Sequence, residues 1–310
     1  MRAPFEWIGR HGTLLLPLGI IAGVAVQPLA HLLFPLLPLT VYAMLTIVLT
    51  RLDVERAIAH IRKPKVFIIS LLYGFVLLPL VLSLIATALP LSPGLTAALV
   101  IYGTAPPNYA AAALAFVMGL DGALTVATIF ASTALHPLIT PVFTGFFVGE
   151  HIHLSATELG LRLAGLIGVA VVSAWALAAW LGPARRKAAT GIFDGINVLI
   201  MVVFAIALMA GIPERVIAQP LYALAMIALA TGLHLGLNLL TVVLFHVAGR
   251  ERAMTFGYAH AGRNIAVVMG VLGSAAPPDA WLFFAMLQFP IYCLPMLLKP
   301  FYARLQRNRG

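Results

Sequence analysis

Long apolar stretches, separated by short charged segments, constrain this chain more than any other feature of its sequence. A transmembrane helix needs about 20 mainly apolar residues, and ten such stretches follow one another. They lie near residues 13–31, 32–50, 66–89, 94–118, 122–148, 159–181, 192–212, 217–247, 254–275 and 280–303. Hydrophobic residues make up 62% of the chain and charged residues 9%, whereas soluble domains carry about 25% charged residues. The sequence therefore predicts an all-α integral membrane protein with ten transmembrane helices, and it excludes a soluble globular domain, a disordered chain and a nucleic-acid-binding protein.

The basic residues predict the orientation of these helices. Ten spans put both termini on one side of the membrane, and cytoplasmic loops are enriched in Lys and Arg. All of the 19 Lys and Arg residues except Arg162, Arg215 and Arg263 then fall on the side of the termini. We therefore expect cytoplasmic N and C termini, most simply in a bacterial inner membrane. This orientation signal accounts for the net charge of +9, so no anionic macromolecular partner is needed.

Three pairs of similar segments indicate an internal repeat. Residues 19–26 (GIIAGVAV) resemble 165–172 (GLIGVAVV), and 103–119 (GTAPPNYAAAALAFVMG) match 257–273 (GYAHAGRNIAVVMGVLG) in position. Pro137 with Pro141 likewise mirrors Pro290 with Pro295. The offset is about 150 residues each time, so each repeat holds five spans and the second copy inserts upside down, the usual architecture of secondary transporters.

Two expected spans contain sequences that break a helix at the same place in each repeat. Thr104–Ala110 (TAPPNYA) holds two adjacent prolines, which remove two amide donors. Gly257–Asn264 (GYAHAGRN) is rich in glycine and polar residues. Irregular backbone at membrane depth persists only where it is buried in protein or lines a cavity, so the two breaks predict one shared central site. The residues expected to break the helices are Pro106, Pro107, Gly257 and Gly262.

Arg263 is the basic residue that falls inside an expected span. An arginine there costs roughly 2.5–3.5 kcal/mol on insertion scales and must face the protein interior. All ten acidic residues lie in loops or at span ends, so Arg263 is expected to bind carbonyls freed at the breaks, and a substrate anion in addition if it is accessible. The candidates for substrate binding or for this central charge are Arg263, Asn264, His260, Asn108, Tyr109, Gln288 and Thr125.

Other polar residues of the spans have simpler interpretations. His136 and His234 are expected to be buried and hydrogen-bonded rather than proton relays, and Ser132 and Thr133 to bond to helix backbone. Asp121 is expected to cap the helix that follows it. We expect no catalytic residues, no metal site and no cofactor.

With these residues in view, the chain resembles the bile acid:sodium symporter family. The resemblance is most specific over residues 104–141, with its T-A-P start, its glycine-containing loop, and an S-T followed by P-x-x-x-P. It implies core helices at 66–148 and 217–303 and panel helices at 13–50 and 159–212. It also implies that the broken helices cross in the core, and that organic anions move inward with two sodium ions.

The same resemblance implies where sodium ligands should be, and most are replaced. The family's Ser-Asn pair falls on Ala111 and Ala112, its Ser and Thr of span five on Thr125 and Ile129, and its acidic residue and Gln of span nine on Ala259 and Arg263. Alanine and isoleucine side chains offer no oxygen, and a guanidinium repels a cation. We therefore expect a divergent member in which Arg263 replaces the cations and sodium is not bound in the usual manner.

The function expected from the sequence is that of a secondary transporter of a small organic anion, working by core-versus-panel alternating access. A sodium-coupled bile-acid-type symporter with remodelled sites and a proton-coupled transporter stay open as alternatives. A channel is disfavoured because a single cationic centre among alanines does not make a filter. An intramembrane enzyme is disfavoured because no H-E-x-x-H, G-x-S-x-G or paired intramembrane aspartate occurs. The arsenite-exporter branch would be expected to carry a cysteine in the broken fourth span, whereas Cys293 lies in the tenth.

Overall fold

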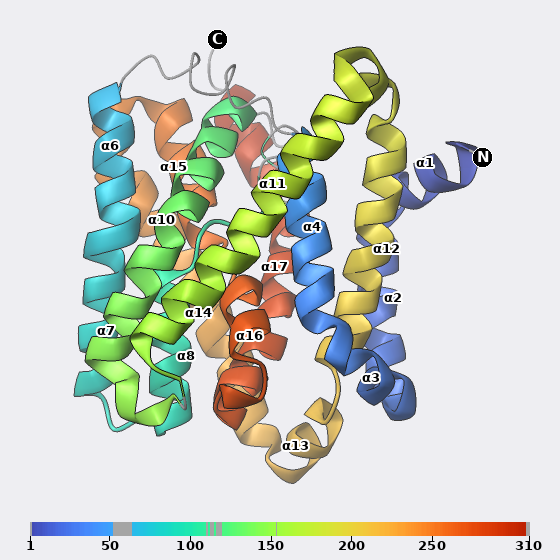
Figure 1. Cartoon of the computed structure of the whole chain (residues 1–310). Helices are drawn as coiled ribbons and strands as arrows, with labels where there is room; N and C mark the ends of the chain where they lie inside the picture. The colour runs from blue at the N-terminus through green and yellow to red at the C-terminus, as the bar shows by residue number, and fades with distance from the viewer. Residues whose placement is uncertain are drawn as a thin grey trace. The chain divides into compact units, whose positions relative to one another are not determined.

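The computed structural model describes residues 2–51, 64–109, 111, 115, 120–152 and 154–307, and these are helical almost throughout (Figure 1). The α-helices are α1 (Arg2–Arg10), α2 (Gly12–Ala25), α3 (Gln27–Leu33), α4 (Leu37–Arg51), α6 (Pro64–Leu72), α7 (Leu78–Ala88), α8 (Pro93–Thr104), α10 (Gly122–Val148), α11 (Ala156–Ala188), α12 (Thr190–Leu208), α13 (Ile212–Ala218), α14 (Pro220–Leu244), α15 (Arg250–Ala261), α16 (Ala266–Leu272) and α17 (Pro278–Arg307). Short 3-10 helices are η1 (Phe34–Leu36), η3 (Gly149–His151), η4 (His246–Ala248) and η5 (Gly273–Ala275), and η2 (Tyr73–Leu77) is a short π-helix.

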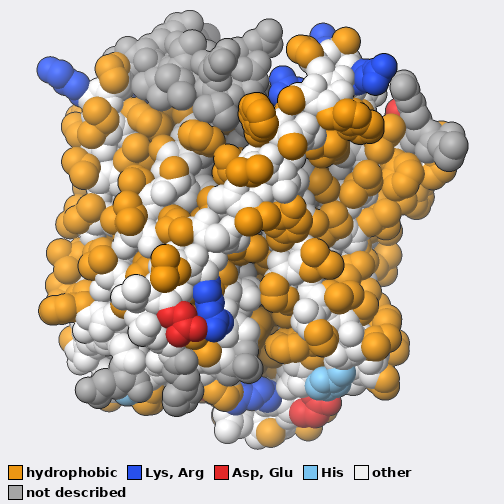
Figure 2. Space-filling model, in the orientation of Figure 1, with side chains coloured by type: hydrophobic (Ala, Val, Ile, Leu, Met, Phe, Trp, Pro, Cys, Tyr) orange, Lys and Arg blue, Asp and Glu red, His pale blue; other side chains and the backbone are white. Residues whose placement is uncertain are grey.

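Six helical stretches of the described residues are long and apolar enough to cross a membrane, or seven if the bent pair Ala3–Arg10 and Leu14–Ala25 counts as one span. The six are Gln27–Arg51, Pro64–Ala88, Gly122–Val148, Ala156–Ala188, Thr190–Leu208 and Pro220–Leu244. Large apolar side chains such as Phe146 and Trp175 are exposed on them, and apolar side chains dominate the visible surface (Figure 2). Such a surface suits lipid rather than water, so the protein is an integral membrane protein.

The count is smaller than the ten expected from the sequence in part because two broken stretches yield short helices. The stretch expected at 94–118 gives α8, which has 12 residues. The stretch expected at 254–275 gives the last half of α15 and the 7 residues of α16. Neither half-helix reaches the length of a bilayer on its own.

The boundary between the first two expected spans was placed wrongly. The sequence suggested a division between 31 and 32, but the helical stretch runs from Gln27 to Arg51. The break lies at Val26, whose backbone is non-helical (φ −120°, ψ 71°), and Pro28 follows in the first turn of α3. Proline is favoured in the first turn because its missing N–H needs no partner there.

By its internal contacts the described chain divides into two compact units. Unit 1 comprises Met1–Leu52 and Ala164–Ala223, and unit 2 comprises Asp53–Leu163 and Leu224–Gly310. Each unit therefore combines one segment from each half of the sequence.

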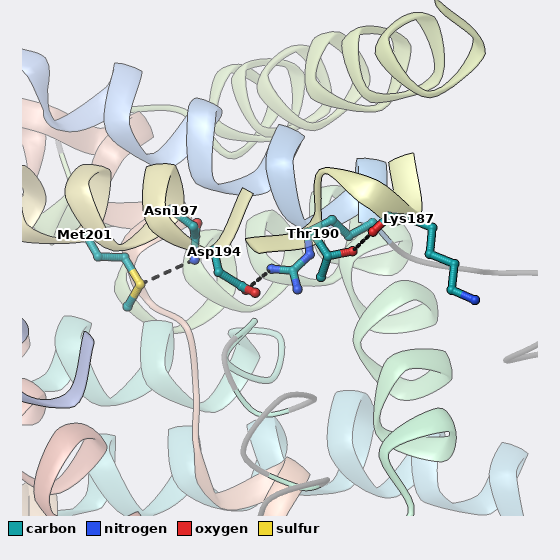
Figure 3. A network of polar contacts seen from close by, with 6 residues as sticks. Lys187, Thr190, Asp194, Asn197 and Met201 are labelled. Atoms are coloured by element: carbon teal, nitrogen blue, oxygen red, sulfur yellow. Dashed lines mark hydrogen bonds and ion pairs between the residues drawn. The ribbon is translucent and has the colours of Figure 1, made fainter. Parts of the chain in front are cut away.

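Unit 1 is held together by close packing of α1 and α2 against α12. A Cβ added to Gly9 would lie 2.8 Å from the Cβ of Asp194, and one added to Gly23 would lie 2.7 Å from the carbonyl oxygen of Ile206. Glycines thus let two helix backbones approach closely, which is how helices associate where no hydrophobic effect drives them. At one end of α12 Arg51 Nη1 lies 2.5 Å from Asp194 Oδ1, and Thr190 Oγ1 donates to the Lys187 carbonyl at 2.8 Å (Figure 3).

Unit 2 packs α8 against α7, α10 and α17. Figure 1 shows α6 and α7 as one continuous rod, joined by η2. Tyr102 of α8 and Phe283 of α17 are fully buried and meet edge to face with ring centroids 6.0 Å apart. Asp121 caps α10 by accepting from Leu124 N at 2.9 Å, so its expected capping role is confirmed. This packing surrounds the ends of α8 and α15, where the candidate site lies.

Candidate functional site

The chain leaves helical geometry after both α8 and α15, and the two irregular segments pair with each other. Pro107 and Arg263 form an isolated antiparallel bridge. Asn108 N donates to the Gly262 carbonyl at 2.7 Å, and Asn264 N donates to the Pro106 carbonyl at 2.7 Å. Pro106 and Pro107 have no N–H to continue α8. The backbone groups freed by each break are therefore satisfied by the other break, and we call this paired region the crossing.

Arg263 fills the centre of the crossing. Its side chain is 0% exposed, and all three nitrogens donate to backbone carbonyls. Nε donates to His260 at 2.9 Å, Nη1 to Ala105 at 2.7 Å, and Nη1 and Nη2 both to Gly74 at 3.2 Å. These carbonyls come from α15, from the end of α8 and from η2. A planar guanidinium can join three such acceptors at once, whereas the compact head of a lysine cannot.

The carbonyl of Gly74 is available because of a proline five residues later. η2 is a π-type turn in which Leu78 N donates to Tyr73 O, five residues back. The corresponding donor for Gly74 O would be the N–H of residue 79, which is proline. Gly74 O therefore has no helical partner, and Arg263 supplies one.

The electrostatics of the crossing also explain a buried cation. α8 ends at Thr104 and α15 at Ala261, so two helix C-termini meet here. Each carries about −0.5 of an elementary charge, which together offset the charge of one guanidinium. No carboxylate pairs with Arg263 in the part of the chain that the structure describes. Helix ends and carbonyls therefore stabilise this cation in place of an acidic residue.

Two further side chains tie the crossing to its surroundings. Tyr102 Oη donates to the Ala261 carbonyl at 2.9 Å, and His260 Nε2 lies 2.7 Å from Ser70 Oγ on α6. A Cβ on Gly74 would collide with the His260 ring. Glycine at position 74 thus makes room for the imidazole and at the same time brings its own carbonyl to Arg263.

The structure brings together most, but not all, of the candidates named from the sequence. Arg263, Asn264, His260, Asn108 and Tyr109 belong to the crossing or border it directly in the chain. Asn108 and Asn264 stay partly accessible, whereas the other three are buried.

Gln288 and Thr125 make local contacts in other helices. Gln288 Nε2 donates to the Phe284 carbonyl of its own helix α17 at 3.1 Å. Thr125 Oγ1 donates to the Asp121 carbonyl at 2.9 Å. Neither is hydrogen-bonded to Arg263 among the described residues, so their part in a site stays a prediction.

Gly257 is not a helix break, contrary to the expectation from the sequence. It lies inside α15, which runs unbroken from Arg250 to Ala261. A Cβ there would lie 2.5 Å from Val242 Cγ2 and 2.9 Å from the Asn238 carbonyl. Gly257 therefore serves close packing of α15 against α14, and the break begins at Gly262.

Three of the positions that resemble sodium ligands of the related family carry apolar side chains in the structure, whereas Thr125 keeps a hydroxyl that donates to the Asp121 carbonyl. Ala111, Ile129 and Ala259 are at most 3% exposed and carry no side-chain oxygen. Ala112 lies outside the described residues. Arg263, at the position of the family's Gln, is surrounded by the carbonyls described above. A cation bound in this region would have to share those acceptors with the guanidinium.

Sequence reasoning missed Gly74 and Pro79, although they complete the site. The segment YGFVLLP, residues 73–79, carries the signal, since a proline inside a transmembrane helix frees a carbonyl of the preceding turn. What could not be read was which distant donor meets that carbonyl.

Comparison with known protein families gives one match. The model of the sodium bile acid symporter family, a family of membrane transporters rather than enzymes, matches residues 38–211, which is more than half of the 310-residue chain. A search of curated proteins found no match. The family match agrees with the membrane-crossing helices. The chain therefore belongs to the sodium bile acid symporter family and is a membrane transporter, not an enzyme.

Proposed function

We propose that the protein is a secondary transporter of a small organic anion that works without sodium coupling of the family's usual kind. In this proposal unit 2 is the core domain and unit 1 is the panel domain, and their relative movement gives alternating access. The division of the chain into units made of one segment from each half supports these roles. So do the two half-helices that end at a common crossing.

The proposed membrane arrangement has ten spans in two inverted five-helix repeats, with both termini in the cytoplasm of a bacterium and the protein in the inner membrane. Six long apolar helices support it in part. α8 and α15, which break at corresponding places of the two halves, would each supply half of a further span. The basic residues near the termini and at Arg185–Lys187 support the orientation.

Arg263 carries the proposal. Its buried guanidinium is bound to carbonyls of Gly74, Ala105 and His260, all within unit 2. We propose that it does permanently what a bound cation does in sodium-coupled relatives, namely neutralise two helix C-termini at the crossing. Because all three of its nitrogens already donate to backbone carbonyls, we assign it this internal role rather than direct contact with substrate. Asn108 and Asn264, which stay partly accessible, are the proposed substrate contacts.

Uptake into proteoliposomes tests the proposal. Purified protein would be reconstituted and offered radiolabelled acetate, benzoate and cholate in sodium, in potassium, and in potassium with an imposed proton gradient. We expect saturable uptake of at least one anion, faster counterflow when the same anion is preloaded, and equal rates in sodium and potassium. Protein-free vesicles are the control for leakage.

The other outcomes separate the alternatives. Uptake lost on replacing sodium with potassium would identify a sodium-coupled symporter with remodelled sites. Uptake driven only by the proton gradient would identify a proton-coupled transporter. Non-saturable flux without counterflow would identify a channel.

A further inference from the structure

His234 of α14 is a buried histidine whose ring nitrogens are unpaired among the residues that the structure describes. It is 3% exposed, and neither ring nitrogen has a hydrogen-bond partner in the described part of the chain. The other two buried histidines of unit 2 differ, since His136 Nδ1 lies 2.8 Å from Thr140 Oγ1 and His260 Nε2 lies 2.7 Å from Ser70 Oγ. The sequence predicted an ordinary hydrogen-bonded histidine at position 234, and among the residues that the structure describes this expectation is wrong.

The ring of His234 lies against the crossing. A Cβ added to Gly262 would have His234 Cε1 as its nearest neighbour at 3.6 Å, followed by the Tyr258 carbonyl at 3.8 Å and Asn108 Cβ at 4.0 Å. Cε1 is the ring atom between the two nitrogens, so both nitrogens flank the point of contact. His234 and Asn108 therefore both lie within 4.0 Å of the position of a Cβ on Gly262.

The remainder of the buried face of α14 is apolar or already satisfied. Thr241 on this face donates to the Leu237 carbonyl and meets Tyr73 Oη at 2.8 Å. Ala230 and Leu237 on the same face carry no polar side-chain atom and are buried. A buried imidazole with two unpaired nitrogens is destabilising, and a phenylalanine or leucine would fill this position without that loss. The histidine is thus better explained by a ligand than by packing.

We infer that His234 is a substrate-binding residue, which donates a ring N–H to the carboxylate of the transported anion above Gly262. This rests on the proposed function and adds a residue to its site beside Asn108. A neutral imidazole offers one donor and one acceptor, and an anionic oxygen takes the donor. The residue after Gly262 is Arg263, which offsets the negative ends of α8 and α15, so an anion bound here does not meet a net negative charge.

Gly262 forms the floor of this site. Its φ of −83° is open to any residue, and an added methyl group would meet its three neighbours at ordinary contact distances of 3.6 Å or more. Gly262→Ala should therefore fold normally, while its methyl group would lie in contact with the His234 ring and obstruct the approach of a carboxylate to it.

The test compares four variants with the wild type. The two assays are proteoliposome uptake and thermal stability of the purified protein. The ligands are acetate, benzoate and cholate, and benzamide is the uncharged analogue of benzoate. His234→Phe keeps the ring volume and removes both nitrogens, and His234→Gln keeps a donor. Gly262→Ala fills the floor. His246→Gln is the control, because His246 in η4 is exposed and its Nδ1 contacts only the Val243 carbonyl of its own turn.

We expect His234→Phe to raise KM about tenfold. This corresponds to a loss of about 1.4 kcal/mol of binding free energy, which is about the contribution of one hydrogen bond to a charged group. Its Vmax should stay near that of the wild type, and its ligand-free melting temperature should be equal or higher. His234→Gln should stay within about threefold of wild-type KM. Gly262→Ala should raise KM without lowering the melting temperature, and His246→Gln should change neither. Benzamide should neither compete for uptake nor raise the melting temperature of the wild type.

Two results would overturn the inference. The first leaves the proposed function intact, and the second is the failure of the proposed function itself. If wild-type protein transports an anion and both His234→Phe and Gly262→Ala keep its KM, His234 only packs or binds water. If His234→Phe fails to fold, the KM of Gly262→Ala decides alone. If no anion of the panel is transported by or stabilises the wild type, the proposed function fails and the ligand assigned to His234 fails with it.

Discussion

Loss of Arg263 should destabilise the protein in a way that a second substitution, at Pro79, partly repairs. Arg263→Ala leaves the carbonyls of Gly74, Ala105 and His260 without their side-chain donor. An unpaired buried polar group costs about 1–3 kcal/mol. Three of them give about 3 kcal/mol at the lower end, which applies because water can enter the space of the lost side chain. For a chain of this size that corresponds to a fall of about 6–12 °C in melting temperature.

Pro79→Ala restores the N–H that Gly74 O lacks in the π-type turn η2. When Arg263 is present, the restored N–H meets a carbonyl already bound by the guanidinium, so Pro79→Ala alone should change stability little. In the Arg263→Ala background it gives one of the three carbonyls a partner and should recover about 1 kcal/mol. The two substitutions are therefore expected to couple by about 1 kcal/mol in a double-mutant cycle, which exceeds the 0.3–0.5 kcal/mol scatter of independent sites.

The assay is thermal denaturation of the purified variants in detergent, read as the monomer remaining on size-exclusion chromatography. Pro17→Ala, which restores an N–H inside α2 of unit 1, is the matched control and should add to Arg263→Ala without coupling. Additive behaviour of Pro79→Ala would falsify the statement that Pro79 makes Gly74 depend on Arg263. An Arg263→Ala protein with the thermal stability and transport activity of the wild type would contradict the central role of the guanidinium altogether.

Three further outcomes follow from the contacts. In proteoliposomes, Arg263→Gln should not become sodium-stimulated, because the ligand positions such as Ala259 stay apolar; stimulation would mean the sodium site is only masked. Gly257→Ala should lower the melting temperature, since its methyl group meets Val242 and a carbonyl, whereas Gly232→Ala has nothing within 4 Å and should not; equal effects in a thermal scan would contradict this packing. Neutralising Asp194 should lower the free energy of unfolding by less than about 1 kcal/mol in chemical denaturation. The reason is that its ion pair with Arg51 is partly exposed, with 31% of the Arg51 side chain and 44% of the Asp194 side chain accessible.

The helix breaks could be predicted from the sequence because their causes are local. Pro106 and Pro107 remove backbone donors whatever surrounds them, so α8 had to end near Thr104. The position of Arg263 at the breaks was readable for a similar reason, since a buried cation needs acceptors and broken helices expose carbonyls. The expectation of carbonyl partners for Arg263 therefore agrees with the contacts found.

Other features depend on contacts between distant parts of the chain and could not be predicted. Gly257 looked like a break because glycine disfavours helices, but it is tolerated where another helix comes close. Gly74 is set against Arg263 and His260 by contacts across about 190 residues. His234 was expected to be hydrogen-bonded because most buried histidines are, and only the three-dimensional structure shows both ring nitrogens unpaired among the described residues.

The tethered charge at the crossing has a consequence for what drives transport. A sodium ion leaves its carrier, so an emptied site differs in charge from a loaded one, and the difference hinders return of the empty protein. Arg263 cannot leave, and with about −0.5 from each helix end the centre of unit 2 stays nearly neutral throughout the proposed cycle. The empty protein would then reorient freely, and net flux would follow the electrochemical gradient of the anion itself. An inside-negative potential of about 100 mV favours exit of a monoanion by about 2.3 kcal/mol, so such a carrier would discharge or exchange cellular anions rather than accumulate them.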